Sequence, residues 1–186
     1  MEIRPVQPGD LEDLLEIDGT VESAEYLHLE RTGEGLAVAW KLELRPLRER
    51  RIAPNRMGDE QKFTLRQVVT GADEGLALLA EHDGRKIALL LAQPDPRYGT
   101  LSLADLRVDY DFRREGLASA LLYQAINEAR DKGLRAVTAE SLTDNLPAAR
   151  LLSKCGFDLA GVDGQRHTNH DLVKEAASLL WYLALD

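Results

Sequence analysis

Apolar residues in the first part of the chain follow a strand pattern and then a helix pattern. Residues 2–6 predict a short strand, and Asp10 is a plausible N-cap for a helix that carries Leu11, Leu14 and Leu15 at helical spacing. Between residues 19 and 62, glycines and prolines break the periodicity, so the segment AVAWKLEL (37–44) fits either a helical turn or a strand.

The middle of the chain predicts three consecutive strands. Two apolar runs within residues 76–93 flank Asp83-Gly84, a dipeptide that favours positive φ and marks a tight hairpin turn. A second turn at 94–99 precedes another apolar strand over 100–108. These strands should form an antiparallel meander.

The strongest helical pattern follows the meander. Lys132-Gly133 ends this helix with a cation and a glycine, and residues 135–142 then predict a strand. Asn145 and Pro147 start a further helix that Gly156 ends, and residues 179–186 predict a final strand. The helical spacing in the first helix is carried by Leu117, Leu121, Leu122, Ala125, Ile126 and Ala129.

This order of elements predicts one mixed α/β domain over residues 1–186. No internal repeat or low-complexity linker suggests a second domain. We expect residues 1–75 to contribute the N-terminal strand, a helix and a substrate-side region. Residues 76–186 should form the core.

Charge and cysteine content narrow the setting and the partners. The formal net charge of −9 argues against non-specific binding to nucleic acid or to an anionic membrane surface, and it favours cationic small molecules. A lone Cys155, with no apolar leader at the N-terminus, predicts a reducing, cytoplasmic setting. No apolar run approaches the roughly 18 residues of a membrane span.

Two charged segments have both a functional and a solvated interpretation. The cluster Arg45, Arg48, Arg50 and Arg51 is interpreted as a solvated helix face, with substrate or phosphate contacts as the alternative. The segment His167-x-x-His170-Asp171 could suggest metal ligands, but it lacks further ligands at a specific spacing. We therefore interpret it as a polar loop and predict no metal. Trp181 and Tyr182 are assigned to packing.

The turn Arg113-Arg114-Glu115-Gly116-Leu117-Ala118 is a candidate anion site. It lies between a predicted strand and the strongest helix, where free backbone N–H groups meet a helix N-terminus. Gly116 lets the backbone approach an anion closely, and the arginines add positive charge. A pyrophosphate fits this arrangement. The alternative is a loop that merely begins a helix.

Together, these motifs resemble the GNAT superfamily of acyl-CoA-dependent N-acyltransferases. The family's Gln/Arg-x-x-Gly-x-Gly/Ala motif matches Arg113, Gly116 and Ala118, and NLPAARLLSKCGF (145–157) matches its Asn-x-x-Ala helix ending in Gly-Phe. LADLRV (103–108), TDNLPAARLLSKCGF (143–157) and LLWYL (179–183) are similar to the streptothricin acetyltransferase branch. The resemblance implies one mostly antiparallel, twisted sheet flanked by helices.

The resemblance also implies a binding site for acetyl-CoA as cosubstrate. Backbone groups of a splayed strand at Leu106, Arg107 and Val108 would bind the pantetheine arm and polarise the thioester carbonyl. The loop from Arg114 to Ser119, including Glu115 and Leu117, would hold the pyrophosphate. Asn145 would contact the pantetheine, cap the next helix, or do both.

Proton transfer is assigned by the same resemblance. Glu140 is the expected base, with a solvent-facing strand glutamate as the alternative. Asp105 is the second candidate, although Ala104 replaces the glutamate that the branch has beside it. The usual general-acid tyrosine position is Leu152. Cys155 is interpreted as a buried apolar residue, and Tyr98, Tyr110 and Tyr182 are other possible donors.

The predicted function is transfer of acetyl from acetyl-CoA to a primary amine of a small cationic acceptor. Such an acceptor would be a streptothricin-type antibiotic, a polyamine or an amino-sugar. The enzymatic alternative is acetylation of a protein N-terminus or lysine. A non-catalytic acyl-CoA-binding module and a binding protein for another nucleotide are further alternatives. Resemblance to the family makes a homodimer possible.

Overall fold

The computed structural model describes residues 1–185 and divides into two compact units. Unit 1 contains Met1–Thr20, Pro54–Ala139 and the chain end from Leu183. Unit 2 contains Val21–Ala53 and Glu140–Tyr182. Both units therefore draw on separate stretches of the chain. The single domain expected from the sequence stays a prediction.

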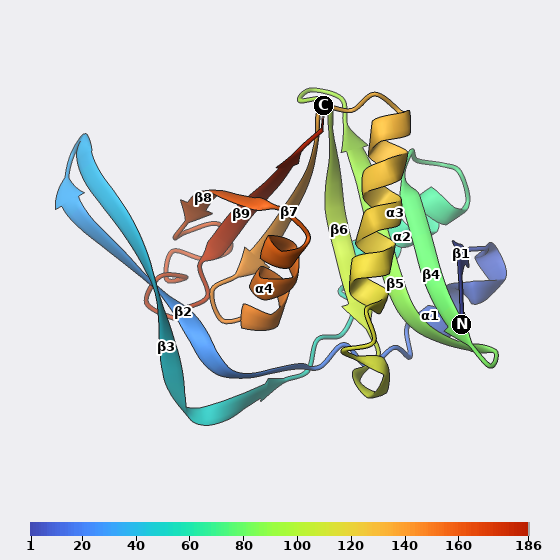
Figure 1. The fold of residues 1–186 in the computed structure, drawn as a ribbon, viewed down its shortest axis with the longest axis horizontal. Helices are drawn as coiled ribbons and strands as arrows, with labels where there is room; N and C mark the ends of the chain where they lie inside the picture. The colour runs from blue at the N-terminus through green and yellow to red at the C-terminus, as the bar shows by residue number, and fades with distance from the viewer. Residues whose placement is uncertain (186) are drawn as a thin grey trace. The chain divides into compact units, whose positions relative to one another are not determined.

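Unit 1 is built on a sheet whose order is β1-β4-β5-β6 (Figure 1). All three neighbouring pairs are antiparallel, as the predicted meander requires. Beyond β6, the beginning of the next strand pairs in parallel. The strands are β1 (Glu2–Pro5), β4 (Leu76–His82), β5 (Arg85–Asp95), β6 (Thr100–Val108) and β7 (Ala136–Leu142), of which β7 continues into unit 2.

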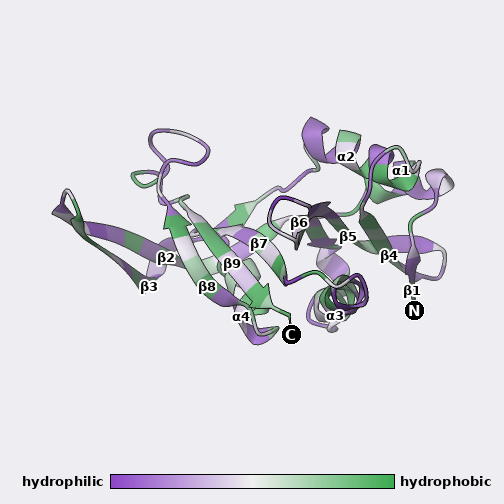
Figure 2. Cartoon of the chain, turned by 90° about the horizontal axis from the view of Figure 1, so that it is seen from above, coloured by the Kyte–Doolittle hydropathy of each residue, from purple (hydrophilic) through white to green (hydrophobic). Residues whose placement is uncertain are grey.

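Helices cover both faces of the unit 1 sheet (Figure 2). Helices α1 (Leu11–Leu14) and α2 (Asp59–Val69) lie on one face, and α3 (Leu117–Asp131) lies on the other. The core on the α1 and α2 side is apolar, and alternate strand residues supply the opposite core under α3. The α1 and α2 core consists of Val6, Leu14, Ile17, Met57, Leu65, Ala77, Leu79, Leu89 and Leu91.

The local signals for the hairpin and for α3 are confirmed. Asp83 and Gly84 both have positive φ, at 50° and 80°, between β4 and β5. Gly133 has a φ of 68° just after α3. Asp10 precedes α1 but makes no side-chain cap bond to it. Its carboxylate instead accepts hydrogen bonds from the Arg4 guanidinium at 2.7 and 2.9 Å.

Unit 2 contains a long two-stranded hairpin and the C-terminal elements. Strands β2 (Val21–Glu34) and β3 (Ala37–Ala53) pair with each other. Asn145 precedes α4 (Leu146–Lys154). Strand β7 is followed in the sheet by β9 (Ser178–Ala184) and β8 (Asp158–Asp163). Asp186, the last residue of the predicted final strand, lies outside the described residues.

One prediction about local structure needs correction: the arginine cluster lies on strand β3 rather than on a helix. Three of these arginines form ion pairs within unit 2: Arg45 with Glu43 at 2.9 Å, and Arg50 with Glu22 and Arg51 with Asp144, both at 2.6 Å. Residues 37–44, for which a helical turn and a strand were both left open, are strand. Strand β3 pairs with β2 along one edge, and most of its side chains are exposed, so no apolar period marks this two-stranded ribbon. Strand β8, over residues 158–163, was not predicted from the sequence.

The described residues contain no helix that is long and apolar enough to cross a membrane.

Candidate active site

The turn into α3 forms the first part of the candidate site. Arg114 and Gly116 both have left-handed backbones, with φ of 65° and 83°. Gly116 is the N-cap residue of α3, and a Cβ there would meet nothing within 4 Å. Glycine is therefore favoured by its φ, and the space beside it is open. The first turn of a 15-residue helix presents N–H groups and the positive end of its dipole, an arrangement that suits a phosphate.

Asp109 fixes the start of this turn. Its side chain is 2% exposed and accepts hydrogen bonds from the backbone N–H of Asp18 at 3.3 Å and of Asp111 at 3.2 Å. Arg85 adds an ion pair at 2.8 Å. The Asp109 N–H donates to the Ile87 carbonyl at 2.8 Å. This buried carboxylate joins the turn to the sheet, a role that the sequence analysis did not assign.

Arg113 holds the turn from within. Its Nε donates to the Val108 carbonyl at 3.2 Å, and its guanidinium lies 5.2 Å from the centre of the Tyr110 ring. Arg113 therefore adds positive charge to the turn, as predicted, and also holds the turn in place through its contacts with Val108 and Tyr110. Leu117 is buried, so only its backbone can serve a ligand. The remaining residues of the predicted loop are at least partly accessible: Arg114, Glu115 and Gly116 are exposed, and Ala118 and Ser119 are half-buried.

Strand β6 has one incompletely paired edge. It pairs with β5 throughout, but its ladder with β7 runs only from Thr100 to Ser102 in the described part of the chain. A register shift against β5 makes Ala104 the extra residue of a bulge. A bulge bends a strand and increases its twist, which explains why pairing stops there. Backbone groups between Leu103 and Val108 are thus available on that side, as the predicted pantetheine contact requires.

The side chains of Arg107 and Asp105 are engaged with each other. Arg107 donates from Nε and Nη2 to the Asp105 carboxylate at 2.6 and 3.0 Å, and from Nη1 to the Asn55 carbonyl at 3.2 Å. Both side chains are almost fully buried. Arg107 can therefore contact a ligand only through its backbone. Asp105 already accepts hydrogen bonds on both oxygens, which weakens its claim as a base.

Glu140 on β7 lies at the centre of a group of side chains that we name the Glu140 cluster: Glu140, Arg166, His167 and Ser178. Its Oε1 accepts hydrogen bonds from Ser178 Oγ and His167 Nε2, both at 2.7 Å. Its Oε2 is 2.9 Å from Arg166 Nε. The Glu140 side chain is 31% exposed. It is therefore neither a free surface glutamate nor a fully buried one.

The cluster holds Glu140 in its ionised form. Burial raises the pKa of Glu140, but hydrogen bonds from Ser178 and His167 and the charge of Arg166 outweigh it. The pKa of Glu140 consequently lies below its ordinary value. The carboxylate is a strong hydrogen-bond acceptor and a weak proton acceptor.

His167 is positioned by a loop that Asp171 organises. Asp171 is buried, and it accepts hydrogen bonds from the backbone N–H of His167 at 2.8 Å and of Thr168 at 2.9 Å. The Thr168 hydroxyl donates to the same carboxylate at 2.7 Å. The polar loop predicted from the sequence thus has a defined shape. Among residues 1–185, no group of His, Cys, Asp and Glu side chains is arranged to hold a metal.

The remaining predicted residues have structural positions. Asn145 caps α4, with its Oδ1 accepting from the Ala148 N–H at 3.3 Å, so the capping role is observed. Leu152 and Cys155 are buried. Leu152 has no group that could protonate a thiolate. Tyr98, Tyr110 and Tyr182 are exposed, and nothing places them at the Glu140 cluster.

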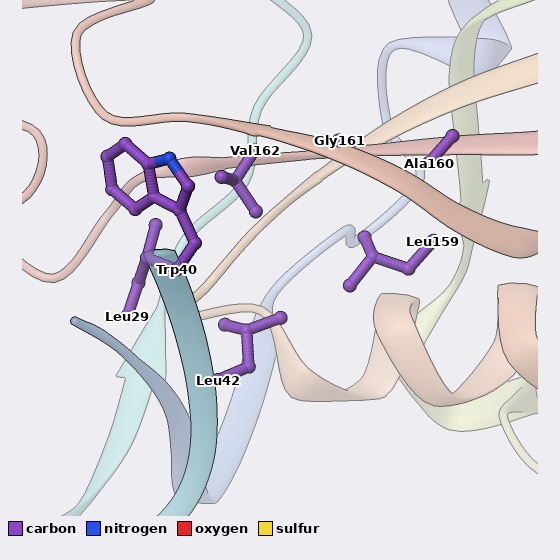
Figure 3. Close-up of a pocket in the computed structure, with 7 residues that line it drawn as sticks. All are labelled: Leu29, Trp40, Leu42, Leu159, Ala160, Gly161 and Val162. Atoms are coloured by element: carbon purple, nitrogen blue, oxygen red, sulfur yellow. The ribbon is translucent and has the colours of Figure 1, made fainter. Parts of the chain in front are cut away.

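An open groove of about 550 Å³ lies within unit 2 (Figure 3). Trp40 and Leu42 project from β3 and face residues of β8. The groove shares no residue with the Glu140 cluster and none with the sites predicted from the sequence. It is lined by Leu29, Trp40, Leu42, Leu159, Ala160, Gly161 and Val162.

Comparison with known proteins identifies the family of the chain. Residues 40–157, more than half of the chain, match the model of the Acetyltransferase (GNAT) family. The chain belongs to the GNAT family. The turn before α3, the free edge of β6, Glu140 and Asn145 all lie within the matched residues. Arg166, His167 and Ser178 lie outside them, so the family match gives no information about these partners of Glu140.

Relatives of this GNAT chain include three streptothricin acetyltransferases. The Escherichia coli protein is 31% identical over 81 residues, 44% of this chain and 47% of the relative. The Bacillus subtilis protein is 29% identical over 84 residues, covering 45% and 48%. The chain thus spans about half the length of these two relatives. The Streptomyces lavendulae protein is 26% identical over 170 residues, covering 87% and 84%.

Solved structures support the GNAT fold over the whole chain. A nourseothricin acetyltransferase superposes with a TM-score of 0.80 at 21% identity, covering 100% of this chain and 98% of the other. A Bacillus anthracis protein solved in complex with acetyl coenzyme A has a TM-score of 0.79 at 18% identity, covering 100% and 97%. The mixed, mostly antiparallel sheet flanked by helices is confirmed.

Proposed function

We propose that this GNAT chain is an N-acetyltransferase that uses acetyl-CoA as cosubstrate and acetylates a primary amine of a small cationic acceptor. The acceptor class that we favour is the streptothricin-type antibiotic, with polyamines and amino-sugars as related candidates. Similarity to three streptothricin acetyltransferases supports this class. The formal net charge of −9 supports a cationic acceptor.

The single observation that carries the proposal is the Arg113-x-x-Gly116-x-Ala118 turn at the N-terminus of α3. The turn is anchored by a buried carboxylate, has positive φ at Gly116, and opens into free space. These features fit a pyrophosphate bound by backbone N–H groups. Bound acetyl-CoA would supply a thioester carbonyl as electrophile. The free backbone edge of β6 after Ala104 fits the pantetheine arm.

The acceptor amine must lose a proton for the reaction to proceed. An alkyl ammonium has a pKa of about 10.4, so it is charged at pH 7 and has no lone pair for attack. We assign removal of this proton to the Glu140 cluster. The usual general-acid position holds Leu152, which is apolar and buried and cannot protonate the thiolate. A thiol with a pKa near ~8.5 is still a tolerable leaving group without a general acid.

A thiol-release assay tests the proposal. The purified protein is given acetyl-CoA and a panel of acceptors: streptothricin-type antibiotics, polyamines, amino-sugars and peptides with a free N-terminus or lysine. We expect turnover with the small cationic amines, and a fall of about 10²–10⁴-fold in Glu140→Gln. Acetyl-CoA affinity of this variant, measured by calorimetry, should be unchanged.

Other outcomes identify the alternatives. Turnover with peptides alone would indicate a protein acetyltransferase. Acetyl-CoA binding with no thiol release from any acceptor would indicate an acyl-CoA-binding module. Competition by ATP for the same site would indicate a different nucleotide ligand.

Two further properties are part of this proposal. The lone cysteine, Cys155, is buried and forms no disulfide, and this supports a cytoplasmic setting. We also propose a homodimer, as the family resemblance implies, and light scattering on the purified protein would test it.

A further inference from the structure

The contacts of Glu140 limit what this carboxylate can do with a proton. Its two oxygens face three donors: Ser178, His167 and Arg166. Each of these contacts favours the ionised carboxylate, and a proton arriving at Glu140 would have to displace at least one of them. The arrangement stabilises a negative charge and fixes the orientation of whatever donates to it. It resembles the relation of a carboxylate to the imidazole that it orients.

Among the three donors, His167 has a second ring nitrogen, Nδ1, that does not face Glu140. An ionised carboxylate only accepts hydrogen bonds, so His167 Nε2 must carry the hydrogen that faces Glu140. In the neutral imidazole, this leaves a lone pair on Nδ1. The His167 side chain is 55% exposed, compared with 31% for Glu140. Asp171 fixes the backbone of His167 from behind.

We propose that His167, oriented by Glu140, takes the proton from the ammonium group of the acceptor. Glu140 is then a positioning residue that acts through His167. This inference rests on the proposed N-acetyltransferase function and names the group that performs its proton transfer. The GNAT match ends at residue 157, so His167 lies outside it.

The step balances in atoms and charge. The N–H bond of the ammonium breaks and a new N–H bond forms at His167 Nδ1, which gives a neutral amine and an imidazolium facing the Glu140 carboxylate. The amine lone pair then forms the C–N bond as the C–S bond breaks, and the nitrogen loses its second proton to the thiolate or to solvent, which leaves the neutral amide. Overall, one ammonium and one acetyl-CoA give one amide, one CoA thiol and one proton. The imidazolium returns its proton to the thiolate or to solvent.

The charged groups around His167 act in opposite directions. Glu140 on β7 favours the imidazolium at a distance of 2.7 Å. Arg166, the preceding residue, opposes it, and it also binds Glu140. Asp171 contributes negative charge from the loop, and Ser178 on β9 is neutral. The contact with Glu140 orients the ring, with Nε2 toward the carboxylate.

The pH dependence of kcat/KM separates imidazole from carboxylate. Imidazole bases titrate between about pH 5 and 8, so the wild type should show a rising limb in that range. The variant His167→Gln should lose about 10²–10⁴-fold in kcat and lose the limb. His170→Gln is the matched control, because His170 is an exposed histidine on the same loop. It should keep both the rate and the limb.

The reverse results would overturn the proposal. A slow His167→Gln enzyme with the limb at its original pH would show that His167 is only structural, and an unchanged rate would exclude it altogether. In Glu140→Gln we expect kcat to fall while the limb remains, because the imidazole is still the group that takes the proton. Disappearance of the limb in that variant would make Glu140 itself the base.

Nitrogen NMR of the imidazole gives a test that does not depend on activity. We expect neutral His167 to hold its hydrogen on Nε2, with Nδ1 bare. The opposite tautomer would overturn the inference even if the enzyme is active. Absence of turnover by the wild type with every acceptor would instead refute the proposed function, and with it the role of His167.

Discussion

At the scale of single residues, Asp109 shows how a buried carboxylate fixes a binding turn. Its carboxylate accepts from two backbone N–H groups and from Arg85. Asp109→Asn keeps the shape of the side chain, but its amide NH2 replaces one carboxylate oxygen. This donor then faces the N–H groups that the oxygen accepted from. We expect a loss of about 1–3 kcal/mol in the free energy of unfolding. If about 1.4 kcal/mol of this acts on the turn, acetyl-CoA binds about tenfold more weakly.

Urea unfolding and calorimetric titration with acetyl-CoA measure the two effects. Asp111→Asn is the control, because it removes the same charge from an exposed neighbour. Equal behaviour of the two variants would show that charge, rather than the anchor, controls the turn.

Asp10 predicts a pH dependence of stability. Its pKa lies well below the usual value because Arg4 donates two hydrogen bonds to it, an effect that outweighs burial. A depressed folded-state pKa means that the ionised group stabilises the protein above its unfolded value of about 3.9, and that this stabilisation is lost as the pH falls through the folded value. We expect Asp10→Asn to be less stable than wild type at pH 7 by about 1–3 kcal/mol.

The difference between Asp10→Asn and wild type should shrink as the pH falls below about 4. Urea unfolding at several pH values measures it, with Asp13→Asn as an exposed control. A difference that stays constant down to pH 2 would contradict the assignment.

Glu140, Asn145 and Gly116 were predicted from their positions within family motifs, and their roles in catalysis and cofactor binding stay predictions. The structure shows Asn145 capping α4. The partners of Glu140 could not be found in this way. His167 and Ser178 contact it from 27 and 38 residues away, and no local pattern encodes such a contact. The sequence analysis noted His167 but could not show that it contacts Glu140.

At the scale of elements, Gly116 tests the turn before α3. Gly116→Ala places a Cβ on a residue with a φ of 83°, which destabilises the fold by about 1–2 kcal/mol without any steric clash. The same Cβ occupies the open space that we assign to the pyrophosphate. Acetyl-CoA affinity should therefore fall by more than tenfold, a change equivalent to over about 1.4 kcal/mol.

Gly71 provides a matched control for this effect. Its φ is 75°, and a Cβ there also meets nothing within 4 Å. Gly71→Ala should lower the melting temperature as much as Gly116→Ala does, while acetyl-CoA affinity, measured by calorimetry, stays at the wild-type value. A similar loss of affinity in both variants would remove the pyrophosphate assignment.

Elements were predictable when their backbone partners are close in sequence. The β4–β5 hairpin and α3 each carry their own turn or capping signal. The β2–β3 ribbon was left undecided because most of its β3 side chains are exposed, so no apolar period marks it. Strand β8 was missed for a related reason: its stability comes from pairing with β9, about twenty residues further on, and its own side chains are at best half-buried.

At the scale of the whole molecule, the net charge of −9 predicts how acceptors arrive. Long-range attraction speeds the association of cations and is screened by salt, with a Debye length of about 10 Å at 0.1 M. We expect kcat/KM for a polycationic acceptor to fall steadily as NaCl rises from about 0.02 to 0.5 M. A monoamine should show a smaller fall. Stopped-flow or steady-state thiol-release assays measure kcat/KM for the two acceptors. Equal dependence of the two values on salt would exclude steering by the overall charge.

The bulge at Ala104 sets the register in which the rest of β6 pairs with β5, and so the position of Asp109 before the turn into α3. The side chain of Ala104 is exposed, so its identity is open to drift during evolution, and the branch glutamate could be lost there without disturbing the core. The number of residues is not open to drift. Deleting one would slide the following residues by about 3.4 Å along β5, and Asp109 would no longer meet Arg85. Natural variants of this protein should therefore tolerate almost any residue at position 104 and no gap.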